Sequence, residues 1–230
     1  MNSFCFKNQP FLRMMKRFVL FFIVLFSIAF CACKKEIRYF DYVSELRSNI
    51  LLARQDGFSL RVYAVEKEYP YIADGVKRET SVRTEIYLLA PSGDKNYEIA
   101  FTINGVTHSG EMSFDNVKAE YYYSCSSDIS LSEKLTVSIS HGEIVKEFTA
   151  VSVTTADTLS PEKALQTLIK TENGLFEDMT DKYGFAGEIY IRLIYEEKPY
   201  YYIGIIDRNG NTTAFLMNAE TGKVLAKRQS

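Results

Sequence analysis

The chain has 230 residues with 27 basic and 29 acidic side chains, a formal net charge of −2, and 47% hydrophobic and 14% aromatic residues. Such a chain is too apolar and too aromatic to remain disordered. Its charge is too balanced for a protein that binds nucleic acid through a basic face. Its four cysteines are too few and too scattered for a disulfide scaffold. The composition therefore indicates a folded protein with no nucleic-acid partner.

The N-terminus has the parts of an export signal. Phe18–Phe30 is an almost unbroken apolar run, Arg13, Lys16 and Arg17 precede it, and residues 1–32 contain no acidic residue. The run is shorter than the roughly 20 apolar residues that a helix needs to span a bilayer. A basic segment followed by a short apolar segment and a small residue is typical of a secretory signal. We therefore expect residues 1–32 to be a signal peptide.

The junction Ala32-Cys33 resembles the lipobox of bacterial lipoproteins, in which a small residue precedes the cysteine that receives lipid. The resemblance implies cleavage between Ala32 and Cys33 and a diacylglycerol thioether on Cys33. Two or three acyl chains hold a protein on a membrane where one barely does. The expectation is an exported bacterial protein, lipid-anchored at the cell membrane or cell envelope, with a tether over residues 33–45.

Two alternatives stay open at this end of the chain: an ordinary cleaved signal with a chance cysteine, and a short uncleaved anchor. Translation could also begin at Met14 or Met15. Removing residues 1–32 takes away four of the 27 basic side chains and none of the 29 acidic ones, which leaves a net charge of −6. Cys125 would then be the only cysteine besides Cys33, so packing alone must stabilise the exported part.

Residues 46–153 have the pattern of short antiparallel strands. Asp56-Gly57 and Asn104-Gly105 each separate two apolar runs, which is the strongest short-range signal of a hairpin. Turn signals recur about every ten residues, as in a β-sandwich of the immunoglobulin-like type. The segment Tyr42–Ala53 could instead be a helix, although a strand from about Asn49 is favoured. The strands expected after Gly57 are Phe58–Glu68, Val82–Leu89, Tyr97–Ile103, Val106–Phe114, Val117–Ser124, Lys134–Ser140 and Ile144–Val153.

A small polar linker over 154–159 leads into a second domain, 160–230. Ser160 and Pro161 predict the start of a helix, because serine is a favoured N-cap and proline a favoured first residue. Asn173-Gly174 predicts its end. The strands expected after it are Glu188–Glu196, Pro199–Asp207, Thr212–Asn218 and Lys223–Arg228. The fold class is therefore mainly β: an antiparallel immunoglobulin-like β-sandwich followed by a small α+β module, a helix plus an antiparallel sheet.

This second domain resembles the PepSY family of small α+β modules from secreted and membrane-attached bacterial proteins. The matching segments are 160–165 (SPEKAL) at the helix start, 202–207 (YIGIID), and 218–225 (NAETGKVL) at the end. Asn218 stands where the family usually has aspartate. The resemblance implies a non-catalytic module, thought to restrain proteases or to work in the cell envelope, and it carries over no catalytic residue.

No set of side chains in the sequence indicates catalysis, a metal or a cofactor. The two histidines, His108 and His141, lie in or beside different hairpins without further ligands at metal-binding spacing. Cys125 has no base placed by a motif and is interpreted as a half-buried structural thiol. Glu66 and Glu68 share one face of a strand, as two solvated residues would. We therefore expect a protein that is not an enzyme.

Clustered tyrosines are the remaining candidates for a functional surface. Alternation along a strand sends the middle residue of a triplet to the face opposite its neighbours, so one set packs in the core and the other can be exposed. Exposed tyrosine is enriched in binding surfaces. The candidate binding residues are Tyr121, Tyr122, Tyr123, Tyr200, Tyr201 and Tyr202.

The function expected from the sequence is that of a membrane-anchored lipoprotein of the cell envelope, a non-catalytic binding or scaffolding module for an unidentified envelope protein or ligand. The alternative is a protease inhibitor or regulator, or an envelope enzyme whose active site is assembled only in the fold.

Overall fold

The computed structural model describes residues 37–93 and 95–230. The predictions about Ala32, Cys33 and the signal peptide lie outside these residues. None of the helices in the described part is long and apolar enough to cross a membrane. The helical elements are η1 (Tyr39–Tyr42), α2 (Pro161–Thr171) and α3 (Asn173–Asp178). The strands are β1 (Val43–Gln55), β2 (Phe58–Glu68), β3 (Thr80–Leu89), β4 (Glu98–Ile103), β5 (Val106–Glu111), β6 (Ser113–Asp115), β7 (Glu120–Cys125), β8 (Lys134–His141), β9 (Ile144–Ser152), β10 (Thr180–Asp181), β11 (Gly184–Phe185), β12 (Gly187–Tyr195), β13 (Pro199–Asp207), β14 (Thr212–Asn218) and β15 (Val224–Gln229).

The long strand β1 begins the fold, and the alternative of a helix over Tyr42–Ala53 is wrong. β1 pairs with β2 along most of its length because Asp56-Gly57 forms a tight hairpin between them. Both turn residues have positive φ, 51° and 80°, which is the geometry of the hairpin turn that matches the twist of the strands. Asn104 and Gly105 repeat it between β4 and β5, with φ of 52° and 79°. The predicted hairpins are therefore confirmed.

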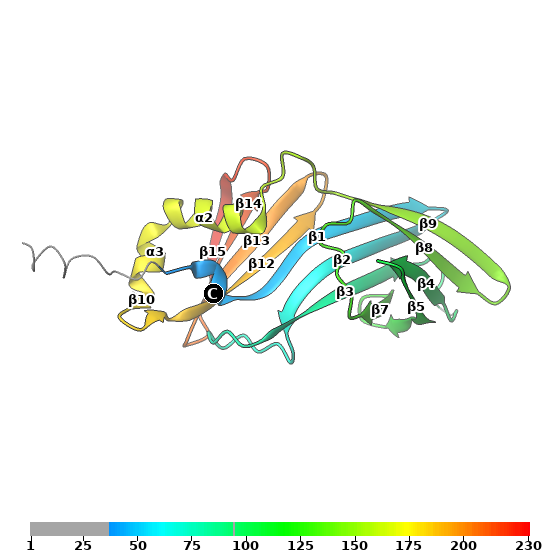
Figure 1. The fold of residues 1–230 in the computed structure, drawn as a ribbon, viewed down its shortest axis with the longest axis horizontal. Helices are drawn as coiled ribbons and strands as arrows, with labels where there is room; N and C mark the ends of the chain where they lie inside the picture. Colours follow the sequence, from blue (N-terminus) through cyan, green and yellow to red (C-terminus); the bar gives the residue numbers. More distant parts are fainter. Residues whose placement is uncertain (1–36, 94) are drawn as a thin grey trace, which may run out of the picture. The chain divides into compact units, whose positions relative to one another are not determined.

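The strands after β1 form one curved sheet, and an immunoglobulin-like sandwich is not confirmed. The sheet runs β1–β2–β3–β7 on one side of β1 and β1–β9–β8–β4–β5 on the other (Figure 1). The expected single strand over 106–114 bends at the buried Met112. Its first half, β5, pairs with β4, and its second half, β6, pairs with β7. This bend brings the two ends of the sheet together, so the arrangement is barrel-like.

One apolar cluster fills the inside of this barrel-like region. It takes alternate residues from each strand, because successive side chains on a strand point to opposite faces. Leu60, Val62 and Ala64 from β2 meet Ile86 and Leu88 from β3 there. The other members of the cluster are Leu51, Tyr97, Ile99, Phe101, Ile103, Met112, Tyr121, Ile129, Leu135, Val137, Ile139, Phe148 and Ala150. The residues between them on β2 and β3 therefore point away from the core.

The C-terminal segment adds helix α2 and strands β12–β15, as predicted from its sequence. The hydroxyl of Ser160 accepts a hydrogen bond from the backbone N–H of Lys163, which confirms the N-cap. Asn173-Gly174 does not end the helical region, since α3 begins at Asn173, directly after the cap residue of α2. The most deeply buried apolar side chains recur at every second residue, Ile189, Ile191 and Leu193 on β12 and Tyr201, Ile203 and Ile205 on β13. Tyr201 places this apolar face on the side of α2, because its hydroxyl donates to the carbonyl oxygen of Leu159 just before that helix. Figure 1 shows α2 lying over one side of these strands.

β1 joins the two parts of the chain in one 13-stranded sheet. It pairs with β2 and β9 in antiparallel fashion and with β12 in parallel fashion. The predicted antiparallel order is therefore correct for every other pairing between the described strands, and this single parallel pair departs from it. Because β12 continues the sheet beyond β1, the side chains of both parts meet on one surface.

Candidate binding face

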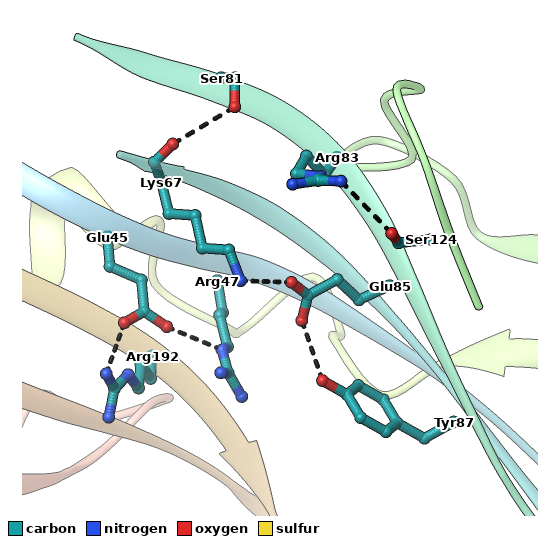
Figure 2. A network of polar contacts seen from close by, with 9 residues as sticks. All are labelled: Glu45, Arg47, Lys67, Ser81, Arg83, Glu85, Tyr87, Ser124 and Arg192. Atoms are coloured by element: carbon teal, nitrogen blue, oxygen red, sulfur yellow. Dashed lines mark hydrogen bonds and ion pairs between the residues drawn. The ribbon is translucent and has the colours of Figure 1, made fainter. Parts of the chain in front are cut away.

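The sheet carries a polar face across β12, β1, β2, β3 and β7, which we call the outer face. It is the side of β1, β2, β3 and β7 that points away from the barrel-like core, and it continues onto the helix-free side of β12. Charged residues and tyrosines make up most of it, although strand register also places the aliphatic residues Leu52 and Val65 on this side. The charged residues and tyrosines are Glu45, Arg47, Arg61, Tyr63, Lys67, Arg83, Glu85, Tyr87, Glu120, Tyr122 and Arg192. Figure 2 shows much of this group from close by.

Strand register lines up three arginines across this face. Arg192 on β12 pairs with Arg47 on β1. Arg47 pairs with Val65 on β2, and Val65 pairs with Arg83 on β3. Because neighbouring strands lie about 4.8 Å apart, the row from Arg192 to Arg83 spans about 14 Å at the backbone. We call Arg192, Arg47 and Arg83 the arginine row; the position on β2 between Arg47 and Arg83 is held by Val65, which is 2% exposed.

Three carboxylates lie beneath the cations of the outer face. Glu45 contacts both Arg192 and Arg47, whose Nε lies 3.0 Å from Oε1. Lys67 contacts Glu85, and Arg61 contacts Glu120. The side chains of the four cations are 24–38% exposed, whereas those of the three carboxylates are 2–10% exposed. Solvent therefore meets mainly positive charge on this face.

The charges shift the titration of neighbouring groups. Burial alone would raise the pKa of Glu45, but the hydrogen bonds and charges of Arg192 and Arg47 outweigh it and hold the pKa below its ordinary value. The hydroxyl of Tyr87 donates a 3.1 Å hydrogen bond to Oε2 of Glu85. Burial and the negative charge of Glu85 raise the pKa of Tyr87. Glu45 is therefore ionised at neutral pH, and Tyr87 is not.

Tyrosine rings form the apolar layer of the outer face. The ring of Tyr87 lies 5.6 Å from that of Tyr63 and 5.1 Å from that of Tyr122, centroid to centroid. Cations cover these rings: Arg47 lies 5.5 Å from the centroid of Tyr63, and Arg61 lies 5.9 Å from that of Tyr87. On β12, Arg192 covers Tyr190 in the same way at 4.5 Å. Such cation–π contacts hold long side chains in place at a partly wet surface.

The six candidate tyrosines divide between the core and the surface. Tyr121 and Tyr201 are only 2% and 1% exposed, and their hydroxyls donate to backbone carbonyl oxygens of Lys95 and Leu159. These two side chains pack in the protein interior, which removes them from any binding surface. Tyr123 packs against the core cluster and closes the gap between β7 and β5 with a hydrogen bond to the carbonyl of Ser109.

The other three tyrosines remain available at the surface. Tyr122 belongs to the outer face, while Tyr200 and Tyr202 are half-buried on β13. Tyr202 extends the outer face beyond β12, since its ring lies 5.7 Å from that of Tyr190. The expected alternation therefore holds: the middle residue of each triplet points to the opposite face from its neighbours.

A pair of buried acids lies beside the outer face, under the connection 69–79 between β2 and β3. Glu68 is 1% exposed and Glu188 is 0% exposed. Glu68 accepts a hydrogen bond from the backbone N–H of Arg78 and forms an ion pair with its guanidinium at 3.7 Å. Tyr71 donates to Oε1 of Glu188 at 3.4 Å, and Oε2 of Glu188 has no hydrogen-bond partner among the described residues. The expectation that Glu68 is solvated is wrong, because the connection folds back over it.

The environment of Glu188 strongly favours its neutral form. Burial raises the pKa of Glu188 to about 7, and the charges of Glu68 and Asp74 add to the shift. Gly75 holds the connection 69–79 close to β13, since a Cβ there would lie 2.4 Å from the carbonyl oxygen of Asp207. This pair could not be predicted from local sequence patterns, because Glu188 and Glu68 lie more than a hundred residues apart.

The remaining candidates from the sequence are not drawn together. His108 stacks on Phe101, and Nδ1 of His141 lies 3.0 Å from the carbonyl oxygen of Asn96. Cys125 contacts the hydroxyl of Ser127 at 3.0 Å, and burial raises the pKa of its thiol, so the reactive thiolate is disfavoured. Within residues 37–93 and 95–230, His, Cys, Asp and Glu side chains do not gather in groups of three that could hold a metal ion.

Comparison with known proteins adds one family. Residues 158–228 match the PepSY family, described as "Peptidase propeptide and YPEB domain". This match confirms the resemblance of the C-terminal segment to PepSY modules. Neither curated proteins nor solved structures gave a match.

Asn218, which departs from the aspartate expected from the PepSY resemblance, accepts the hydrogen bonds of the closing turn. Its Oδ1 accepts hydrogen bonds from the backbone N–H groups of Glu220 and Thr221, at 3.0 and 2.8 Å, and from the hydroxyl of Thr221. The departure from the family pattern therefore leaves the closing turn intact.

Proposed function

We propose that this protein is a non-catalytic binding module of the bacterial cell envelope, held on a membrane by lipid on Cys33. The observation that carries the proposal is the outer face, where arginine and tyrosine side chains cover five adjacent strands. These two residue types dominate the energetics of protein–protein interfaces. The partner in this proposal is an envelope protein or ligand rather than nucleic acid, since the exported chain carries more acidic than basic residues.

The lipid anchor is tested separately from binding. Replacing Cys33 with alanine removes the only atom to which the lipid would be attached. We expect the parent chain to fractionate with membranes and the Cys33→Ala variant to appear in the soluble envelope fraction. Cys31→Ala serves as the matched control and should leave the chain on the membrane. Membrane recovery of Cys33→Ala equal to that of the parent would refute the anchor.

Binding through the outer face is tested by photo-crosslinking in living cells. A photo-reactive phenylalanine analogue replaces Tyr122 or Tyr202 on the face, and Tyr183 serves as a control because it is 83% exposed on the turn between β10 and β11. We expect a discrete crosslinked product from Tyr122 and Tyr202 and none from Tyr183. Equal products from all three positions, or none at all, would contradict the proposal.

The second candidate function is regulation of a peptidase, and the match of residues 158–228 to a family described by its peptidase propeptides supports it. In this version the partner on the outer face is a peptidase. The purified chain is added to the envelope fraction of a strain that lacks it, and hydrolysis of a fluorescent casein substrate is followed. A dose-dependent decrease in hydrolysis favours this candidate, and an unchanged rate counts against it.

A further inference from the structure

The cations of the outer face outnumber its carboxylates. Five cations, Arg47, Arg61, Lys67, Arg83 and Arg192, face three carboxylates, Glu45, Glu85 and Glu120, which leaves a surplus of two positive charges. The chain as a whole carries a net charge of −2, so the positive patch is a local feature. A local field of this kind attracts a ligand of opposite charge.

Arg83 is the cation of the outer face that forms no ion pair within the described residues. Its guanidinium contacts no carboxylate among the described residues. Its Nη2 donates a long hydrogen bond of 3.4 Å to the hydroxyl of Ser124, and its Cζ lies 5.6 Å from the ring centroid of Tyr69, a side chain that is 79% exposed. Its Nε is buried without a hydrogen-bond partner, and the same holds for Nε of Arg192 at the other end of the arginine row. Both Nε atoms are buried and out of reach of a ligand, so an acceptor in solvent would meet the Nη groups, which carry four of the five N–H donors of each guanidinium.

Cations lie over two of the tyrosines on this face, Tyr63 and Tyr87. Arg61 and Lys118 both lie over Tyr87, at 5.9 and 5.5 Å, and Arg47 lies over Tyr63. At these two tyrosines, a ligand that approaches from solvent therefore meets guanidinium and ammonium groups before it meets the rings. This arrangement favours recognition of an anion over stacking of a neutral sugar ring.

We propose that the arginine row binds an extended acidic polypeptide segment, which crosses strands β12 to β3 and places carboxylates against Arg192 and Arg83. This inference rests on the proposed binding function and specifies the chemistry of its partner. Carboxylates four residues apart in an extended chain are separated by about 14 Å, which matches the backbone span of the row. The planar donor pairs of arginine suit a carboxylate in bidentate geometry.

The test measures binding of defined probes to the full chain purified in detergent. The probe is a fluorescent ten-residue peptide of alternating glutamate and threonine, followed by fluorescence anisotropy. Expected results are saturable binding that weakens as salt increases, and no binding of the same peptide with glutamine in place of glutamate. Arg83→Gln should weaken binding about tenfold or more, as loss of a charge-assisted hydrogen bond predicts. Arg208→Gln, on the exposed turn between β13 and β14, should leave binding unchanged.

Other outcomes overturn the inference. Equal binding of the glutamine peptide, or equal loss in Arg83→Gln and Arg208→Gln, would show that charge at the arginine row does not select the ligand. Binding of an oligogalacturonate in place of the peptide would change the partner from a protein to an acidic glycan. Arg83 forms no ion pair with a carboxylate among the described residues, so its replacement leaves no buried acid without a partner. The circular dichroism spectrum of Arg83→Gln should therefore match that of the parent. Arg83→Lys should restore part of the affinity.

The crosslinking experiment separates failure of this inference from failure of the proposed function. If the crosslinked product from Tyr122 persists in Arg83→Gln at the parent yield, the binding function stands and the acidic partner is wrong. If the parent chain gives no product at all, the binding function itself is wrong.

Discussion

Glu188 should make the stability of the protein fall as pH rises through neutrality. Its pKa is about 7 in the folded state and 4.5 in the absence of perturbation. At a pH between these two pKa values, Glu188 keeps its proton in the folded chain and has released it in the unfolded chain. The folded state is therefore more stable when Glu188 is protonated than when Glu188 is ionised. This contribution to the free energy of unfolding is lost as pH rises towards and through 7.

The magnitude follows from the two pKa values. One pKa unit corresponds to about 1.4 kcal/mol, so the free energy of unfolding should decrease by roughly 2–3 kcal/mol between pH 5 and pH 8 through this group. Glutamine has nearly the same shape and no charge. We therefore expect Glu188→Gln to lack this decrease and to exceed the parent in stability at pH 8, with a much smaller difference at pH 5.

The assay is urea unfolding at pH 5, 6, 7 and 8, followed by far-ultraviolet circular dichroism. Subtracting the free energy of unfolding of the parent from that of the variant at each pH removes the contributions that the two chains share. Glu196→Gln, at an exposed position in the turn after β12, is the matched control and should follow the parent at each pH. Parallel pH profiles for Glu188→Gln and the parent would mean that Glu188 is hydrated in the folded protein, and the reasoning from its burial would fail.

Three further predictions concern the elements that hold this arrangement. Gly75→Ala places a Cβ against the backbone of Asp207 at a φ of +76°, so it should cost about 1–3 kcal/mol and also flatten the pH dependence, as seen by the same urea titration. Ser160→Ala removes the N-cap hydrogen bond of α2 and should lower the free energy of unfolding by about 1 kcal/mol, whereas Ser160→Asp should retain it. Asn218→Ala removes three hydrogen bonds from the closing turn and should lower the midpoint of thermal unfolding clearly. Asn218→Asp keeps the acceptor oxygen and should leave the midpoint near the parent value. Similar losses in both variants would contradict the assigned acceptor role of Oδ1.

The sequence by itself determined the local elements. Asp56-Gly57 and Asn104-Gly105 specify hairpins because few other residue pairs tolerate two successive positive φ angles. Ser160-Pro161 specifies a helix start for equally local reasons, and the alternation of each tyrosine triplet follows from the period of a strand. These signals act over a few residues, so they can be read without knowledge of the fold.

Tertiary structure alone decided how the sheet closes and which polar groups meet. The bend at Met112 lets one predicted strand serve two partners, and the parallel pairing of β1 with β12 joins segments about 140 residues apart. No local pattern encodes either event. For the same reason Arg47, Arg83 and Arg192 look like unrelated surface residues in the sequence and become one row only through strand register. Periodicity assigns a side chain to a face, but long-range pairing assigns its neighbours, and the neighbours determine what the face can bind.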